Sequence, residues 1–376
     1  MASKVCRSCT SGYHSVIMLR EPVSAGLSDR AVMFRSMGNL AASLCAALVV
    51  SRPCHALKAM HNKGRRLSCD VPWSRYFSSH DMCSLQGISN SNHCSYLHGK
   101  RCAEAVIAPN CSWYGGVANQ LISGPRVTLR SQMMSSSVTA TYDLAVKELE
   151  AGRRFTWLFT GYWPWRVDLS NHIERSGLRS GYSPPSLLQQ ASGGTSCGPI
   201  MIGPSQLVVD LCESYMSHLG QRRAMVAVHV RRGDRTRYLQ RCNTTAAAVA
   251  RVVAVELQKA STVKGGLRCA ACGHASSPLA LLVFTDERST AYLEELRSLL
   301  TAAVRLPIRL HFSDEEIIDL LKERAEGLAQ DNFLIYSVAR LVMQRAALHI
   351  SFRRCERNGG VAAVSHGRDR WAGLLA

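Results

Sequence analysis

The strongest constraint on the fold of this chain is a pair of short, almost entirely apolar segments in its second half. The first covers residues 224–230, with the sequence AMVAVHV, and the second covers residues 279–285, with the sequence LALLVFT. Apolar runs of this length, without a polar residue at every second position, are expected for strands that are buried on both faces. Such strands occur mainly in parallel sheets that helices cover on both sides.

Helical patterns and shorter apolar runs alternate with these two segments. Further strands are expected at 308–312 and 347–352, and helices at 204–219 with Pro204 in the first turn, 244–260, 289–300, a segment capped by Ser313, and 332–345. This alternation is typical of right-handed βαβ crossovers and a parallel sheet. Ligands of such sheets bind beyond the carboxyl ends of the strands, so a binding site is expected at that edge.

The length of 376 residues favours two domains. The regular second half predicts an α/β domain over residues 204–376. The first half predicts another domain over residues 21–203, preceded by an irregular N-terminal tail over residues 1–20. Residues 178–203 are rich in Gly, Ser and Pro and are interpreted as the linker between the two domains.

Within the first half, local signals are fewer. Ser28 and Asp29 are N-cap candidates for a helix whose apolar face continues as far as Leu48, and residues 48–50 are expected to turn into a short strand. Residues 54–155 are poorly patterned and rich in Cys, Ser and Asn. They predict long loops and small helices.

Aromatic side chains are concentrated between Phe155 and Trp165. One interpretation is a stacking platform for a sugar or a base. The other is an aromatic core cluster, which is the commoner use of such residues. The sequence favours the core cluster and leaves the platform open.

The formal net charge of +18 favours anionic partners. Nucleic-acid modules usually gather their charge in a patch with interleaved aromatic residues. Here the basic residues are spread as single arginines and pairs, so nucleic-acid binding is not expected. Phosphorylated small molecules are therefore the favoured partners, and RNA or polyanion binding remains an alternative.

Compartment signals in the sequence disagree. Fifteen cysteines and the sequons at Asn110 and Asn243 favour an oxidising compartment of the secretory pathway, the lumen of the ER or Golgi. Residues 1–20 lack the apolar core of a signal peptide, and the apolar stretch 40–50 is too short to span a bilayer. A soluble intracellular protein is the alternative localisation.

Two cysteine motifs each offer half of a zinc site: Cys6 with Cys9, and the segment 269–274, which ends in His274. A structural zinc site needs four ligands, and neither motif has an evident second half. They are interpreted as a flexible tail and as a loop, so no metal site is predicted.

The end of the 224–230 strand carries the strongest chemical signal. Arg231 and Arg232 follow the strand directly, Gly233 permits a sharp turn, and Asp234 can form an ion pair with one of the arginines. Arginine makes bidentate, permanently charged contacts with phosphate oxygens. His229 offers a further donor beside the same ligand. A solvated basic turn is the alternative, and the position at the carboxyl end of a buried strand favours binding.

Segment 229–234, with the sequence HVRRGD, resembles the H-x-R-R-G/T-D motif of the GDP-fucose-dependent fucosyltransferases. Two weaker matches occur in the order expected for that family. Residues 26–30, with the sequence GLSDR, look like the loop that opens the N-terminal domain of these enzymes. Residues 283–287, with the sequence VFTDE, are similar to the strand that follows the first motif.

The resemblance implies a GT-B fold, with two Rossmann-like domains facing a cleft. It implies inverting transfer of fucose from GDP-fucose to a glycan or protein hydroxyl, with no metal needed for the chemistry and no cofactor besides the donor substrate. Arg231 would bind the β-phosphate and assist its departure. The other implied donor contacts are His229 at the guanosine, Arg232, Gly233 and Asp234 in the loop, Asp286 near the nucleotide, and Gly26, Leu27, Ser28, Asp29 and Arg30 from the other domain.

The general base expected for an inverting enzyme has no clear candidate. The related α1,6 enzymes carry a Glu a few residues beyond the arginine pair, where this chain has residues near Leu239. Glu287, Asp314 and Glu315 follow strand ends, but the favoured interpretation is that they are acids of helix N-termini. A non-catalytic member of the same fold is therefore a second hypothesis.

Overall fold

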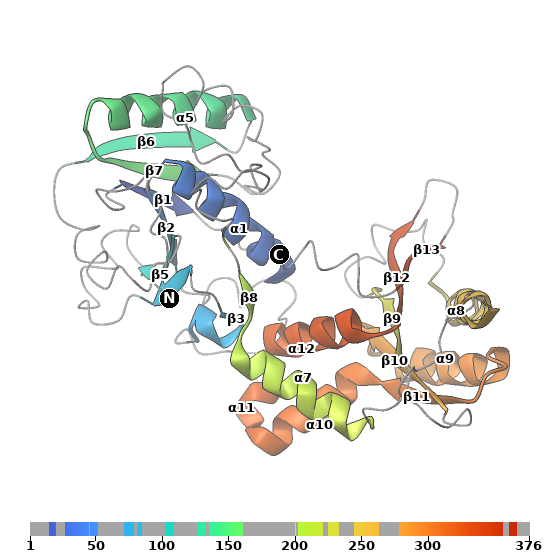
Figure 1. The fold of residues 1–376 in the computed structure, drawn as a ribbon. Coiled ribbons are helices and arrows are strands. Elements are labelled where there is room, and N and C mark those ends of the chain that lie inside the picture. The colour runs from blue at the N-terminus through green and yellow to red at the C-terminus, as the bar shows by residue number, and fades with distance from the viewer. Residues whose placement is uncertain are drawn as a thin grey trace. The chain divides into compact units, whose positions relative to one another are not determined.

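The computed structural model describes residues 15–19, 27–44, 46–51, 71–78, 81–84, 103–108, 126–132, 135–160, 200, 202–220, 225–232, 244–262, 278–355 and 361–366. The chain divides into two compact units, Met1–Ser205 and Gln206–Ala376. Each unit contains a largely parallel sheet with helices packed on it (Figure 1). The predicted α/β class is therefore confirmed.

The second unit is built on a sheet in which the described strands have the order β11-β10-β9-β12-β13. The strands are β9 (Met225–Val230), β10 (Leu279–Thr285), β11 (Ile308–Phe312), β12 (Leu348–Cys355) and β13 (Val361–His366). The helices are α7 (Gln206–His218), α8 (Ala246–Thr262), α9 (Thr290–Ala303), α10 (Ser313–Arg324), α11 (Glu326–Ala329) and α12 (Asn332–Arg345). The pairings among β11, β10, β9 and β12 are parallel, and β13 runs antiparallel to β12 at the edge.

Alternation along the central strand β9 divides its side chains between the two faces of this sheet. Val226, Val228 and Val230 pack into a core together with side chains of α8 and α9. Because successive side chains of a strand point to opposite faces, Ala227 and His229 point to the other face. On that face, α12 contacts β9 and α10 contacts β10. Helices thus cover both faces, as the apolar sequence of β9 predicts.

In the described residues, three helices of this unit begin with side-chain caps. At the start of α8, the Thr245 hydroxyl oxygen accepts a hydrogen bond from the Ala248 amide at 3.3 Å. Ser289 precedes α9, and its hydroxyl oxygen accepts a hydrogen bond from the Tyr292 amide at 3.4 Å. Asp331 precedes α12, and its Oδ1 accepts bonds from the amides of Phe333 and Leu334, both at 3.1 Å. Each cap satisfies amide groups that have no partner within the helix.

Several predictions for the second unit are confirmed to the residue, namely the strands 279–285 and 308–312 and the helix 332–345. Two details are wrong. Pro204 lies in the short strand β8 (Gly203–Pro204) and pairs with Phe77, so α7 begins after it. Ser313 is the first residue of α10 and makes no capping hydrogen bond.

The C-terminal edge of this sheet is formed by a segment with a weak strand signal. The chain is rich in Gly and Ala after β12, and residues 361–366 form β13 and pair with β12. The segment alternates little and contains small side chains, which are poor strand signals. An antiparallel edge strand needs only one neighbour, so this weak sequence is sufficient.

The first unit has a sheet in which the described strands have the order β4-β5-β2-β1-β7-β6. The strands are β1 (Ser15–Leu19), β2 (Ala46–Ser51), β4 (Met82–Ser84), β5 (Ala103–Ile107), β6 (Val127–Gln132) and β7 (Phe155–Thr160), and β3 (Phe77–Ser78) pairs separately with β8. The helices are α1 (Leu27–Ser43), α5 (Ser135–Glu150) and the short 3-10 helix η3 (Trp73–Arg75). Pairings among β2, β1, β7 and β6 are parallel, and β5 is antiparallel to both β2 and β4.

The predicted irregular tail over residues 1–20 is wrong for its last part. Residues 15–19 form β1, which lies between β2 and β7 in the sheet. Val16 and Ile17 are completely buried. The Ser15 hydroxyl accepts a hydrogen bond from the Phe155 amide at 3.1 Å, which fixes the start of β7 against β1. The domain therefore uses sequence that was assigned to the tail.

The prediction of loops and small helices over residues 54–155 also needs correction. Residues 135–150 form the four-turn helix α5, which lies along β6 and β7 (Figure 1). Its N-terminal half is rich in Ser and Thr, which have low helix propensity. Burial of Val138, Tyr142 and Ala145 against the sheet stabilises the helix instead.

Helix α1 begins and ends earlier than predicted. It starts at Leu27, so Ser28 and Asp29 lie inside its first turn rather than at the N-cap, and it ends at Ser43, so that Leu48 belongs to β2. Gly38 in this helix sits against the sheet. A Cβ atom added there would lie 3.0 Å from a side-chain carbon of Ile107, which explains a glycine inside a helix.

The aromatic cluster at the end of the first unit is a core cluster in the described residues, as the sequence favours. Phe155, Trp157 and Phe159 are buried in β7, and the rings of Trp157 and Phe159 stack with centroids 4.6 Å apart. The Trp157 indole N–H donates to the Ser131 hydroxyl at 2.8 Å. The remaining aromatic residues of the cluster lie outside the described residues: Tyr162, Trp163 and Trp165.

Candidate functional site

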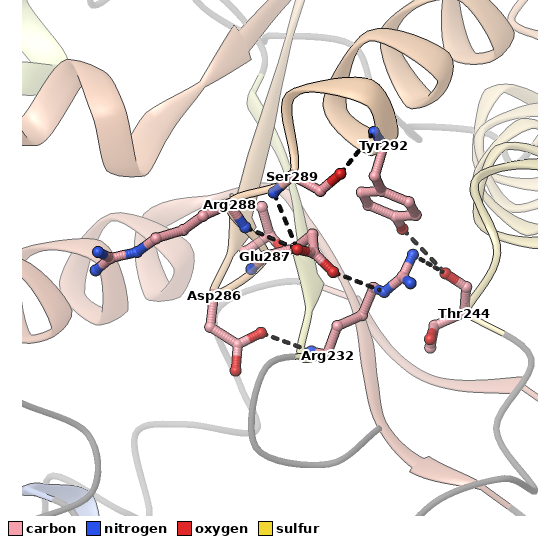
Figure 2. A network of polar contacts seen from close by, with 8 residues as sticks. Arg232, Thr244, Asp286, Glu287, Arg288, Ser289 and Tyr292 are labelled. Carbon is pink, nitrogen blue, oxygen red and sulfur yellow. Dashed lines mark hydrogen bonds and ion pairs between the residues drawn. The ribbon is translucent and has the colours of Figure 1, made fainter. Parts of the chain in front are cut away.

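Polar side chains gather at the carboxyl edge of the sheet in the second unit. Arg231 and Arg232 follow β9, Asp286 and Glu287 follow β10, and Asp314 lies in the first turn of α10 directly after β11. Because these strands are parallel neighbours, their ends lie at one edge, where open α/β sheets bind ligands. Figure 2 shows the polar contacts that connect the first two of these segments.

Arg232 is held from three directions (Figure 2). Its Nε lies 3.3 Å from a carboxylate oxygen of Glu287, and its Nη1 donates to the carbonyl oxygen of Thr244 at 3.2 Å. Its guanidinium carbon lies 3.8 Å from the ring centroid of Tyr292. The Arg232 and Glu287 side chains are only 22% and 20% exposed, so water screens the pair less than a surface ion pair. Arg232 is therefore part of the scaffold of this edge.

The carbonyl of Thr244 accepts a second hydrogen bond at the same place. The Tyr292 hydroxyl donates to it at 3.0 Å, beside the bond from Arg232. Burial raises the pKa of Tyr292, and the Arg232 guanidinium opposes this rise. The phenol therefore stays protonated at physiological pH and acts as a donor, and the Thr244 carbonyl receives two donors.

Backbone amides orient the Glu287 carboxylate, in addition to its contact with Arg232. Its Oε1 accepts hydrogen bonds from the amides of Arg288 at 2.9 Å and Ser289 at 3.0 Å. The amide of Glu287 itself donates to the hydroxyl of Thr285 at 3.1 Å. The other carboxylate oxygen, Oε2, is the one that faces Arg232. Glu287 thus presents a fixed negative group to the segment after β9.

Two further carboxylates fix the backbone where the strands end. Oδ1 of Asp286 accepts a hydrogen bond from the amide of Arg232 at 2.6 Å. Oδ2 of Asp314 accepts one from the amide of Thr285 at 2.5 Å. The end of β9 is thereby tied to the end of β10, and the end of β10 is tied to the start of α10.

Asp314 is the one of these acids with a strongly shifted titration. Burial raises the pKa of its carboxyl to about 7, and the nearby charges of Asp286 and Glu315 act in the same direction. The hydrogen bond from the Thr285 amide and the charge of Arg288 favour the ionised form but do not offset the burial. The carboxyl of Asp314 therefore changes its charge near neutral pH.

Strand alternation, continued beyond β9, places Arg231 and Arg232 on opposite sides of the chain. Arg232 contacts Tyr292 of α9, which is the side on which Val230 is buried. Continued alternation from β9 places Arg231 on the other side, with His229. His229 is 8% exposed, and Arg231 is partly buried. His229 and Arg231, two of the residues that the family resemblance assigns to the donor, are thus expected on one face of the edge.

The observed ion-pair partner of Arg232 is Glu287, a residue of the neighbouring crossover. The expected ion pair of Asp234 with one of the two arginines stays a prediction. Gly233 and Asp234 lie outside the described residues. A signal for Glu287 exists in the sequence, because it follows the neighbouring strand by two positions and parallel neighbours end at the same edge.

Of the three candidate bases, two accept backbone hydrogen bonds and one is exposed. Glu287 and Asp314 accept backbone hydrogen bonds beside helix starts, as the interpretation of helix-terminal acids predicts. Glu315 is exposed in the first turn of α10. Asp286 remains a predicted nucleotide neighbour, and its observed contact is the amide of Arg232.

The predicted donor contacts of the first unit lie at the start of α1. Leu27 is buried, and Ser28 and Asp29 lie in the first helical turn. Arg30 is completely buried, with its guanidinium carbon 5.5 Å from the ring centroid of Trp73. A buried, ring-stacked arginine packs as a structural residue. The contact of these residues with a pyrophosphate stays a prediction, and Gly26 lies outside the described residues.

A second polar network lies beside this edge and was not predicted. The Tyr215 hydroxyl donates to Glu316 at 2.7 Å, and Nδ1 of His311 lies 2.9 Å from the same carboxylate. Burial alone would raise the pKa of Glu316, but the hydrogen bonds from His311 and Tyr215 lower it below its ordinary value. The network connects α7 to β11 and α10. It therefore stabilises the packing of α10, the helix that carries Asp314.

Two expectations concern metals and membranes. Among the described residues, no group of three or more His, Cys, Asp or Glu side chains is arranged to hold a metal ion. No helix within the described ranges has the length and apolar character needed to cross a bilayer.

Comparisons with known proteins yield matches to solved structures alone. No family model and no curated protein matches the sequence. NodZ alpha-1,6-fucosyltransferase soaked with GDP-fucose matches with 12% identity over 94% of this chain and 99% of that chain, at a TM-score of 0.40. Fucosyltransferase NodZ from Bradyrhizobium matches with 12% identity over the same shares, at a TM-score of 0.36. A mutant of Arabidopsis thaliana FUT1 in complex with GDP matches with 10% identity over 95% of this chain and 74% of that chain, at a TM-score of 0.39.

Proposed function

We propose that the second unit binds a nucleotide-sugar donor at its carboxyl edge, and that the protein is a glycosyltransferase that uses GDP-fucose. The observation that carries this proposal is the carboxyl edge itself, where Glu287 and Tyr292 hold Arg232 directly beside Arg231. A parallel sheet binds its ligand at this edge. The segment that supplies the arginine is also the one that resembles the family motif.

In this function, Arg231 compensates the negative charge of the leaving group. Transfer of fucose breaks the bond between the sugar carbon and the β-phosphate oxygen, so charge grows on the phosphate as the bond lengthens. A guanidinium that is already in place stabilises this charge without solvent reorganisation. Its fixed fork of donors matches two phosphate oxygens at once. His229 would contact the guanosine part of the same donor.

The acceptor in this proposal is a hydroxyl group of a glycan or a glycoprotein, attacked with inversion. The family to which the motif is similar needs no metal for the reaction, and we extend this to the present chain. Glycosylation of this kind takes place in the secretory pathway, so we propose the lumen of the Golgi or ER as the compartment. The cysteine content and the sequons support that location.

Arg231→Ala tests the donor site. We expect GDP to raise the melting temperature of the wild-type protein, because a ligand at about 100 times its Kd adds about 2.7 kcal/mol to the unfolding free energy. Loss of charged hydrogen bonds worth about 1.5–3 kcal/mol should weaken GDP binding by roughly 10- to 100-fold in the variant. A thermal-shift series with GDP, GDP-fucose, GDP-mannose, UDP-sugars and RNA, followed by calorimetric titration, measures both effects.

Arg309→Ala is the matched control, since Arg309 is exposed on β11 and its removal changes the net charge equally. This variant should bind GDP like the wild type. Equal GDP affinity in Arg231→Ala would show that the site assignment is wrong. RNA binding that GDP does not displace, with a steep salt dependence, would favour the polyanion alternative.

A donor-binding protein without transfer activity is the second candidate. The observation that favours it is the engagement of Glu287 and Asp314 in backbone hydrogen bonds, which leaves neither in the position of an available base. Incubation with GDP-fucose and a panel of glycan acceptors distinguishes the two. Release of GDP that depends on acceptor supports the transferase, and binding of GDP-fucose without turnover supports the second candidate.

A further inference from the structure

We propose that Arg232, Glu287 and Tyr292 are positioning residues, and that together with the carbonyl of Thr244 they form a clamp that fixes the chain at residues 232 and 244 and so positions Arg231 for the donor. The four groups are called the Arg232 clamp below. Its effect on a ligand rests on the proposed function, because it assumes that the donor binds beside Arg231. Its existence as a mechanical device does not depend on that assumption.

The clamp joins two points of the chain that are 12 positions apart. Arg232 follows β9 directly, and Thr244 lies two residues before α8 begins. The guanidinium of Arg232 donates to the carbonyl of Thr244, and the hydroxyl of Tyr292 donates to that same oxygen. Both points are thereby attached to the start of α9. The chain enters and leaves the intervening segment at fixed positions.

The contacts of the clamp begin with a carboxylate that the backbone fixes after the end of β10. Glu287 is oriented by the amides of Arg288 and Ser289, and its second carboxylate oxygen faces Arg232. The ring of Tyr292 closes the opposite face of the guanidinium at 3.8 Å. A cation between a carboxylate and an aromatic ring, with little exposure to water, has few alternative orientations.

The clamp also fixes the backbone next to the proposed ligand contact. The amide of Arg232 donates to Asp286, so both the main chain and the side chain of this residue are immobilised. Arg231 precedes it by one peptide bond, and strand alternation places its side chain on the face of His229. Because a peptide unit is planar, fixing residue 232 restricts the direction from which the Arg231 side chain departs. The clamp therefore preorganises Arg231 for an anion.

The chain offers variants that remove single contacts of the clamp. Glu287→Gln keeps an acceptor for the amides of Arg288 and Ser289 but removes the ion pair. Tyr292→Phe keeps the ring against Arg232 but removes the donor to Thr244. Arg232→Lys keeps the charge but lacks the planar guanidinium that lies against the Tyr292 ring and donates to Thr244, so it should weaken binding as well. Glu294→Gln, exposed on the same helix, is the control for the change in charge.

We expect Glu287→Gln and Tyr292→Phe each to raise the Kd for GDP about three- to tenfold, the range that one hydrogen bond or ion pair contributes. With an active enzyme, kcat/KM for the donor should fall by at least the same factor, because the Arg231 guanidinium that the clamp positions contacts the donor phosphate both before and during transfer. Hydrogen exchange in peptides covering residues 225–232 and 244–250 should accelerate in both variants without ligand. Glu294→Gln should match the wild type in every readout.

The readouts separate failure of the clamp from failure of the proposed function. If the wild type binds no guanine nucleotide, the proposed donor is wrong. The exchange data alone then show whether the clamp restrains the chain. If GDP binds the wild type and both variants equally well, the clamp does not position Arg231 for the donor. Unchanged exchange in both peptides overturns the clamp whether or not GDP binds.

Discussion

Asp314→Asn is expected to raise the free energy of unfolding of the second unit by about 2–4 kcal/mol above pH 8, and to change it little near pH 4. The substitution removes a buried carboxyl whose pKa is raised to about 7 from its ordinary value of 3.8. Asparagine keeps an oxygen that can accept the hydrogen bond from the Thr285 amide. Only the charge is lost.

The direction follows from the two protonation equilibria. Below pH 4 the carboxyl is protonated in both the folded and the unfolded chain, so it contributes no electrostatic cost. Between pH 4 and pH 7 the unfolded chain releases this proton and the folded chain retains it, so stability falls by about 1.4 kcal/mol per pH unit. Above pH 7 both forms are ionised and the cost stays constant. The gain from asparagine therefore grows from pH 4 to pH 7 and then levels off.

Urea unfolding of the wild type and the variant at pH 4.5, 6, 7.5 and 8.5 measures this difference, and peptide hydrogen exchange assigns it to the second unit. Glu323→Gln is the control, because Glu323 is exposed at the other end of the same helix. A difference in stability that does not depend on pH would mean that Asp314 titrates at its ordinary pH in the folded protein. The shift in pKa would then be wrong.

Trp157→Ala is expected to destabilise the first unit by about 3–5 kcal/mol, which is the usual cost of removing a fully buried large aromatic residue. Trp157 is completely buried in β7, stacks on Phe159 and donates its indole N–H to Ser131. The substitution leaves a cavity and removes the hydrogen bond from the indole to the Ser131 hydroxyl. Because domains are stable by only about 5–15 kcal/mol, the folded population of the unit should fall strongly.

Denaturation followed by hydrogen exchange in peptides from residues 127–160 measures the loss, since this signal does not depend on the fluorescence of the removed indole. Leu144→Ala is the control. Leu144 lies on α5 in the same unit and is 49% exposed, so its loss should change stability by less than about 0.5 kcal/mol. An equally small effect of Trp157→Ala would argue that its ring serves as a binding surface rather than as core.

The strands and helices of the second unit could be predicted closely, because the sequence of each strand indicates whether one or both of its faces are buried. The apolar runs of β9 and β10 have no polar face, which indicates helices on both sides, and α12 carries one clear apolar stripe. β1 has a similar apolar character, but it is short. Its neighbours β2 and β7 are distant in sequence, and no local pattern reports such pairing. The weak intrinsic propensity of α5 is likewise overcome by packing against the sheet.

In the candidate site, too, some features have a local sequence signal and others depend on contacts between distant segments. The arginine pair after β9 marks the edge on its own, because two guanidiniums after a buried strand have a limited number of uses. Nothing in the two adjacent letters distinguishes Arg231 from Arg232. The distinction comes from Glu287 and Tyr292, which lie in another crossover, and from the strand alternation that separates the two side chains. Contacts between crossovers depend on strand order, which sequence patterns do not report.

The central position of β1 has a consequence for synthesis of the chain on the ribosome. This strand emerges before the rest of its sheet, yet one of its two neighbours is β7, and the Ser15 hydroxyl meets the Phe155 amide across a separation of 140 residues. One edge of an apolar strand therefore stays without its partner while most of the first unit is translated. Unpaired apolar edges are sites of intermolecular association. Yield of folded protein should consequently respond to translation speed and to chaperones that shield nascent strands.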